Sequence, residues 1–224
     1  MLYTKSCPCY NYFMAGIKIY DFHETVYSSV TDSVKAGESP AEIMDRIHRL
    51  TQQRTAEDIS DEEASHIKCR RGCSHCCRVH VPVLCLEADT IAGYLLSSLS
   101  TDDIEELKRK LHYIKVHIAG YDEQERIIAN IPCGFLGSEG ECTIHPVRPL
   151  VCRSVTSADA DACRRAMTMS ICEENAFIPM NILHKSIYDS AFIGLADAMK
   201  DMGIDCRSFE ITEAVLQRLG KRIV

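Results

Sequence analysis

Apolar residues recur at spacings of three and four along much of the chain, which is the period of an amphipathic α-helix. The longest such stripe follows Ser100 and consists of Ile104, Leu107, Leu111, Ile114 and Ile118. Ser100 is a good N-cap residue, and Asp102 and Asp103 place acidic side chains in the first turn. The pattern therefore predicts a helix over residues 101–118 that ends near Gly120.

A second helix is predicted from its N-terminal signals. Ser39 and Glu42 have the spacing of a capping box, and Pro40 stands at the first helical position. Ile43, Ile47 and Leu50 then share one face. Further helices are predicted over residues 87–99, from about residue 159, over residues 179–202 and between residues 208 and 219, the last two ending at Gly203 and Gly220.

Three stretches lack the helical period. Residues 130–155 contain several glycines and prolines, which predicts an ordered loop. Residues 79–84 alternate apolar and polar positions, which predicts a short strand, and a strand fragment is expected at residues 143–144. Residues 55–65 are acidic and poor in apolar side chains, which suggests a solvated connector.

Composition narrows the class of protein. The 224-residue chain carries a net charge of −7, which gives it no general attraction to nucleic-acid phosphates. The one basic run, at residues 68–71, lacks interleaved aromatic residues, so no nucleic-acid partner is expected. No apolar stretch approaches the 18 residues that span a membrane. We expect a cytoplasmic protein without a membrane partner.

Thirteen cysteines change this picture, because eight of them gather in two segments. These are Cys69, Cys73, Cys76, Cys77, Cys133, Cys142, Cys152 and Cys163. Disulfides are disfavoured because the total is odd and because Asn11 interrupts the only candidate for the apolar core of a secretory signal. Thiolates packed this densely repel each other unless a cation lies between them, so the eight cysteines predict a zinc or iron–sulfur centre.

The spacing leaves the number of centres open. Cys73 and Cys76 can approach one ion from a single turn, whereas consecutive side chains such as Cys76 and Cys77 point apart in most backbones. Eight thiols allow two four-thiolate sites, or one cluster with spare thiols. His75 or His145 can replace a thiolate, although a role outside the ligand set is the simpler reading of each.

Cations flank the proposed ligands. Arg148 and Arg153 lie on either side of Cys152, and we expect them to donate hydrogen bonds to sulfur or to a bound cluster. The basic residues beside Cys69 are expected to lower thiol pKa values. The remaining cysteines are interpreted as buried thiols at Cys85, Cys172 and Cys206, and as unassigned at Cys7 and Cys9.

The combined motif has a known counterpart. Cys69-x3-Cys73-x2-Cys76-Cys77, followed by Cys133-Gly-Phe-Leu, Cys142-x-Ile and Arg-Pro-x-x-Cys152-Arg, resembles the YkgJ-type cysteine-cluster family. That family is described as chelating zinc or iron, and similar motifs occur in flagellin lysine N-methylases, where the cysteines hold an iron–sulfur cluster. The resemblance covers residues 68–163 and favours a cluster of the 4Fe–4S type over zinc. His145 departs from it, because the family more often has tyrosine there.

The resulting expectation is a mainly α fold, a small helical domain organised around a cysteine-held metal or cluster, with ordered loops and few short strands. Residues 1–60 are expected to form a helical arm, residues 61–170 the cysteine domain, and residues 171–224 C-terminal helices packed on it. The function expected is metal or cluster binding. The alternatives are a protein-modifying or redox enzyme that acts on a protein substrate, such as a lysine N-methylase-like protein, and a structural zinc module that binds a protein partner.

Overall fold

The computed structural model describes residues 19–168 and 177–220. Within these residues the chain forms ten α-helices, one 3₁₀ turn and one two-stranded sheet, which confirms the mainly α fold. The helices are α2 (Ile19–Lys35), α3 (Pro40–Asp58), α4 (Asp61–Ser65), α5 (Cys85–Ser98), α6 (Thr101–Ile118), α7 (Glu123–Ala129), α8 (Leu150–Ser154), α9 (Ala160–Ala166), α10 (Ile182–Asp201) and α11 (Ile211–Gly220). Among them, no helix is both long enough and apolar enough to cross a membrane.

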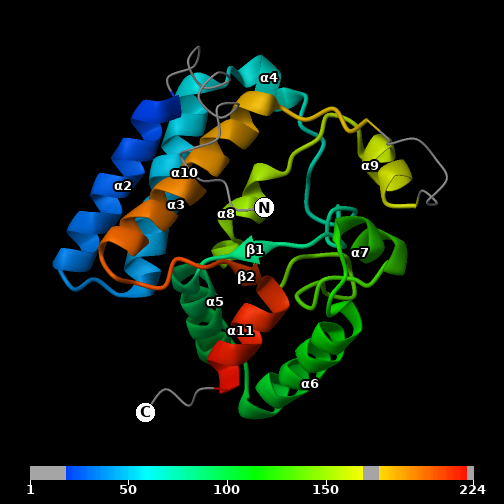
Figure 1. Ribbon diagram of the computed structural model, residues 1–224. Coiled ribbons are helices and arrows are strands. Elements are labelled where there is room, and N and C mark those ends of the chain that lie inside the picture. Colours follow the sequence, from blue (N-terminus) through cyan, green and yellow to red (C-terminus); the bar gives the residue numbers. More distant parts are fainter. Residues whose placement is uncertain (1–18, 169–176, 221–224) are drawn as a thin grey trace.

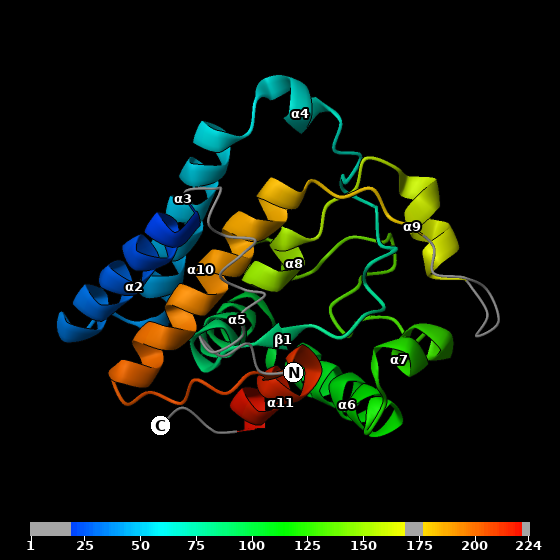
Figure 2. The same cartoon turned by 45° about the horizontal axis from the view of Figure 1, so that its top comes forward.

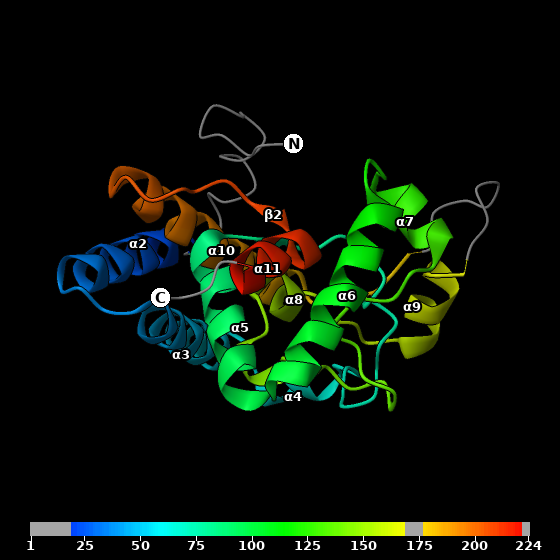
Figure 3. The same cartoon turned by 90° about the horizontal axis from the view of Figure 1, so that it is seen from below.

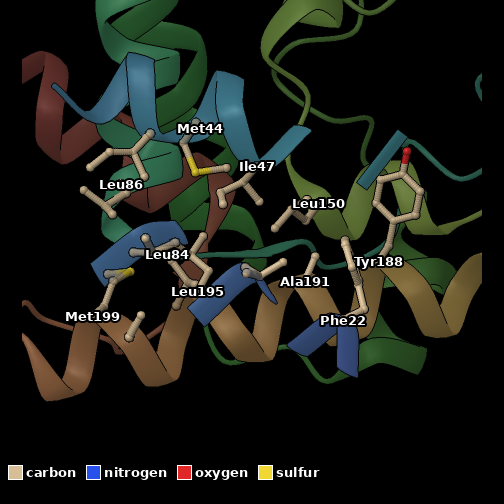
Figure 4. Packing of buried hydrophobic residues seen from close by; sticks show 14 of the residues in the cluster. Phe22, Met44, Ile47, Leu84, Leu86, Leu150, Tyr188, Ala191, Leu195 and Met199 are labelled. Carbon is tan, nitrogen blue, oxygen red and sulfur yellow. The ribbon is translucent and has the colours of Figure 1, made fainter. Parts of the chain in front are cut away.

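The first core lies between α2, α3 and α10, which run side by side in Figure 1. Val26, Ile47 and Leu195 are fully buried there, one from each helix. Figure 4 shows Leu84, Leu86 and Leu150 reaching into this core from the start of α5 and from α8. The core therefore ties the N-terminal helices to the segment that carries Cys152.

A glycine permits the close approach of α2 and α10. A Cβ atom at Gly194 would lie 2.8 Å from the carbonyl oxygen of His23 and 3.2 Å from Cβ of Val26. Beside this contact, buried His23 hydrogen-bonds Asp197 across the two helices at 2.9 Å, and Tyr27 donates to Asp201 at 2.8 Å. The two helices are thus held by packing and by polar contacts.

The second core lies between α5, α6 and α11, which Figure 3 shows from below. Ile91, Leu111 and Val215 are fully buried in it, and Phe135 and Ile144 enter from the loops between α7 and α8. The sheet closes one side: β1 (Pro82–Val83) pairs antiparallel with β2 (Phe209–Glu210), with Val83 opposite Phe209. Figure 2 shows α8 beside α10, and these two helices link the second core to the first.

Most of the predicted helices are confirmed, together with their capping signals. Both α3 and α6 begin with a capping box, at Ser39 and Ser100. The connector predicted over residues 55–65 is helical: α3 continues to Asp58 and α4 follows with its own capping box at Ser60, and residues 60–65 are exposed. Asp61, Glu62 and Glu63 lie in the first turn of α4, where their negative charge stabilises the N-terminus of the helix.

The loop predicted over residues 130–155 is confirmed only in part. A 3₁₀ turn (His145–Val147) and α8 interrupt it, and α7 precedes it. The expected strand shrinks to Pro82–Val83, and the expected fragment at residues 143–144 is replaced by an isolated bridge between Leu136 and Cys142. The boundaries near residues 60 and 170 stay predictions. The packing places α10 with α2 and α3, and α11 with α5 and α6.

Candidate metal centre

Seven of the eight proposed ligands line one cavity of about 570 Å³. They are Cys69, Cys73, Cys76, Cys77, Cys133, Cys142 and Cys152. They come from three segments of the chain: the run after α4, the loop between α7 and α8, and α8 itself. The eighth, Cys163, lies on α9 and is absent from the lining, although its charge acts on the pKa of Cys69.

The first cysteine segment folds as successive tight turns. The amide of Cys73 donates to the carbonyl of Arg70 at 2.9 Å, and the amide of Cys77 donates to that of Ser74 at 3.0 Å. Gly72 stands in the first turn with a φ of +87°, a left-handed conformation that other residues rarely adopt. These turns place cysteines close in sequence on the same cavity wall.

Backbone contacts hold the second segment against the first. The amide of Cys133 donates to the carbonyl of Cys77 at 2.8 Å. Farther along, a Cβ atom at Gly140 would lie 3.2 Å from the carbonyl oxygen of Gly72, so the two loops touch backbone to backbone. At the other end of the run, the amide of Lys68 donates to the carbonyl of Ser157 at 2.8 Å. Backbone hydrogen bonds and close backbone contacts thus join the cavity walls.

The third segment is positioned by a buried carboxylate. Glu87 is 2% exposed, and its two oxygens accept from the amides of Leu84 at 3.0 Å and Leu150 at 2.8 Å. It therefore ties the N-terminus of α5 to that of α8, the helix that carries Cys152. Burial raises the pKa of Glu87 to about 7, against the opposing effect of these two hydrogen bonds.

Burial and hydrogen bonding raise the pKa of several cavity thiols. Burial raises the pKa of Cys133 to about 11 and also raises the pKa of Cys152. For Cys76 the largest cause of a raised pKa is its hydrogen bond with the Cys77 side chain, followed by burial. The prediction that the basic residues beside Cys69 lower its pKa is wrong, because burial is the largest cause of a raised pKa at Cys69. Arg148 does act to lower the pKa of Cys76 and Cys152, but its effect is smaller than the rise.

The charged lining is nonetheless mainly positive. Five arginines line the cavity against two glutamates, although the whole chain carries a net charge of −7. The arginines are Arg70, Arg71, Arg126, Arg148 and Arg153, and the acids are Glu141 and Glu210. This excess favours an anionic occupant, and a four-thiolate centre is anionic.

Arg148 and Arg153 both line the cavity, but their resolved hydrogen bonds go to backbone carbonyls. Arg148 donates to Cys152, and Arg153 donates from Nε to Arg148 at 2.8 Å and from Nη2 to Pro146 at 2.9 Å. These bonds brace the turn that precedes α8. The predicted contact of the two arginines with sulfur stays a prediction.

The structure also places the other candidates. His145 lines the cavity and His75 does not. Cys85 and Cys206 pack against the first core, as expected of bystander thiols, while Cys7, Cys9 and Cys172 lie outside the described residues. Sequence reasoning missed Arg126, whose sequence surroundings, Glu-Gln-Glu-Arg, are those of a solvated helix face. It also missed the apolar wall that includes Val81 and Phe135.

The donor chemistry fits a thiolate-bound metal, and the positions fit it incompletely. Thiolates are the preferred ligands of zinc and of iron–sulfur clusters. Within the described part of the chain, however, no three histidine, cysteine or acidic side chains already stand close enough to hold one ion.

Comparison with known proteins agrees with this chemistry. Residues 68–175 match the CxxCxxCC family, described as "Putative zinc- or iron-chelating domain". The chain has three residues between Cys69 and Cys73 where the family name has two. No curated protein and no solved structure matches the chain. The seven cysteines around one cavity all fall inside the matched region, so the similarity to this family covers the whole lining of thiols.

Proposed function

We propose that this protein binds a metal centre through the cysteines of the cavity, and that the centre is an iron–sulfur cluster of the 4Fe–4S type. The observation that carries the proposal is the convergence of seven cysteines, from segments up to 83 residues apart, on one cavity. A metal-free fold has no need of so many thiols in one place. Cys163, near Cys69, is proposed as a further ligand or a reserve thiol.

The preference for a cluster over zinc rests on the resemblance of the cysteine motif to that of flagellin lysine N-methylases. Zinc and a 4Fe–4S cluster are each held by four thiolates, and the cavity of about 570 Å³, with its seven cysteines, has enough sulfur for either. Its excess of arginines also suits a centre that carries negative charge in every redox state.

The test is anaerobic purification followed by determination of iron, zinc and acid-labile sulfide per chain. The proposal predicts iron and sulfide in nearly equal amounts, with broad visible absorption that bleaches on reduction. Zinc without sulfide would retain the metal site but reject the cluster. A chain that carries neither metal, and takes up neither on reconstitution, would overturn the proposal.

A further inference from the structure

Arg126 is a buried arginine whose charge has no ion-pair partner in the described part of the chain. It lies on α7, is 1% exposed and lines the cavity. Its Nη1 donates to the carbonyl oxygen of Ile131, two residues before Cys133. Its Nε is buried and finds no acceptor among the described residues.

This arrangement is costly unless an anion completes it. A guanidinium keeps its proton under all ordinary conditions, and arginine is almost never fully buried without a partner. Glu123, Glu210 and Cys133 are close enough to raise the pKa of Arg126, but burial outweighs them and lowers it. Among the described residues the guanidinium makes its hydrogen bond to the carbonyl of Ile131, and its Nε has no partner. Cys133 as a thiolate, or an anionic group bound in the cavity, would supply the direct partner that the guanidinium lacks.

Two other arginines of the cavity have different hydrogen-bond partners. Arg148 and Arg153 donate to backbone carbonyls that shape the turn before α8. Arg126 also donates to the backbone of its loop, at Ile131, but its buried Nε–H has no acceptor among the described residues. The amide of Cys133 donates to the carbonyl of Cys77, and the Cys133 side chain lies close enough to Arg126 to act on its pKa.

We propose that Arg126 is the counter-charge of the bound metal–thiolate centre, and that its Nε–H donates to the sulfur of Cys133. This inference rests on the proposed function. It makes Arg126 a positioning residue that places a positive charge beside the bound sulfurs and lowers the cost of gathering them in a buried site. The bound centre in turn removes the penalty of an unpaired buried charge.

The experiment compares Arg126→Met and Arg126→Lys with Arg109→Gln, an exposed arginine of α6, in the full-length protein purified without oxygen. Two quantities are measured: the rate at which a chelator removes the metal, and the melting temperature of the metal-loaded and metal-free forms. We expect Arg126→Met to lose metal 10–100-fold faster than the wild type. Arg126→Lys keeps the charge but lacks the Nε–H, so its rate of metal release should lie between those of Arg126→Met and the wild type. Arg109→Gln should release metal at the wild-type rate.

The melting temperatures separate this role from an ordinary structural one. Without metal, Arg126→Met removes an uncompensated buried charge, so this variant should melt no lower than the metal-free wild type. With metal, it should melt lower than the loaded wild type. If Arg126→Met lowers the melting temperature equally with and without metal, or releases metal as slowly as Arg109→Gln, the inference is overturned and the proposed function stays intact. If Arg126→Met fails to fold, wild-type release rates in Arg126→Lys would overturn it. A wild-type chain that binds no metal would overturn both.

Discussion

Each thiol of the cavity faces a competition between proton and metal. Burial keeps Cys133 and Cys152 protonated near neutral pH, because a thiolate there is poorly solvated. A metal ion reverses this preference by supplying the positive charge that the buried thiolate lacks. The proposed metal centre should therefore depend most on the residues whose sulfur is withdrawn from water inside the cavity.

Substitution of single cysteines should separate ligands from bystanders. Cys133→Ser and Cys152→Ser remove cavity thiols, and each should at least halve the metal bound per chain. Cys206→Ser is the matched control, because Cys206 packs against the first core and is absent from the cavity lining. Metal analysis of the three purified variants tests the assignment. Equal metal content in all three would contradict it.

Glu87 should impose a pH dependence on stability. Its folded pKa of about 7 exceeds the ordinary value of 4.5, so between these pH values the folded state binds more protons than the unfolded state. Its contribution to the free energy of unfolding is fully present below pH 4.5 and declines as the pH rises through 7. At about 1.4 kcal/mol per pKa unit, the total decline is about 3 kcal/mol.

Glu87→Gln provides the measurement. A glutamine amide cannot accept from both the Leu84 and Leu150 amides, so the variant should lose about 1–3 kcal/mol at pH 5. The difference from the wild type should shrink towards pH 8, because only the wild type pays for ionisation. Urea unfolding at matched metal content reports it. A difference that is constant from pH 5 to pH 8 would show that Glu87 does not titrate there.

At the scale of elements, the cavity depends on loops that touch through their backbones. Gly140 has a φ of +76° and faces the carbonyl of Gly72. Gly140→Ala should therefore cost about 1–2 kcal/mol through left-handed strain alone. It should also weaken metal binding, because the loop that carries Cys142 moves away from the run that carries Cys73. Denaturant unfolding and metal titration check the two effects.

Gly93→Ala is the matched control for that substitution. Gly93 is exposed within α5, and a Cβ atom there meets nothing within 4 Å. Alanine favours the helix over glycine by up to about 1 kcal/mol, so this variant should be slightly more stable and bind metal normally. If both variants lose metal equally, the contact between Gly140 and Gly72 is unimportant for the site.

The elements that sequence reasoning predicted well are those that carry their own signals. The apolar stripe of α6 and the capping boxes of α3 and α6 are local features, and the structure confirms them. The five-residue helix α8 was missed because Pro146 and Pro149 suggest a loop. The helix also depends on the burial of Leu150 in the first core, whose other residues are far away in the sequence. Strand β2 was missed for a similar reason: its pairing with β1 joins residues far apart in sequence.

The candidate site also contains residues that the sequence predicts and residues that it does not. The cysteines can be recognised in the sequence by their number and spacing, and seven of them line one cavity. The buried Arg126 and the carboxylate of Glu87 have no such signal, because each sits in an ordinary helical pattern. Burial alone gives them their roles, and burial is a property of the assembled fold. For this reason the sequence predicts the donors better than the residues that tune them.

At the scale of the whole molecule, the two cores should respond differently to loss of the metal. The first core buries residues of α2, α3 and α10 and needs no cavity cysteine. The second core packs directly against Cys133, Cys142 and Cys152. Metal binding worth about 10–16 kcal/mol in small zinc peptides is comparable with the whole stability of a typical domain. Loss of the centre should therefore loosen one half of the molecule.

Hydrogen exchange on metal-loaded and metal-free protein tests this division. Removal of the metal should abolish protection over residues 69–83 and 130–153, while α2, α3 and α10 keep most of theirs. Limited proteolysis should cut the segment 130–149 first. Unchanged protection over both segments would mean that the centre is not structural. A uniform loss over the whole chain would mean that the two cores unfold together.

The central claim is that cysteine sulfurs from separate segments of the chain hold the metal. X-ray absorption at the metal edge of the anaerobically purified protein tests it most directly, because it identifies the atoms bound to the metal. The account predicts about four sulfur neighbours per metal, at about 2.3 Å if the metal is zinc, and a further shell of neighbouring metal atoms if the centre is a cluster. A first shell dominated by nitrogen or oxygen at about 2.0–2.2 Å would contradict it.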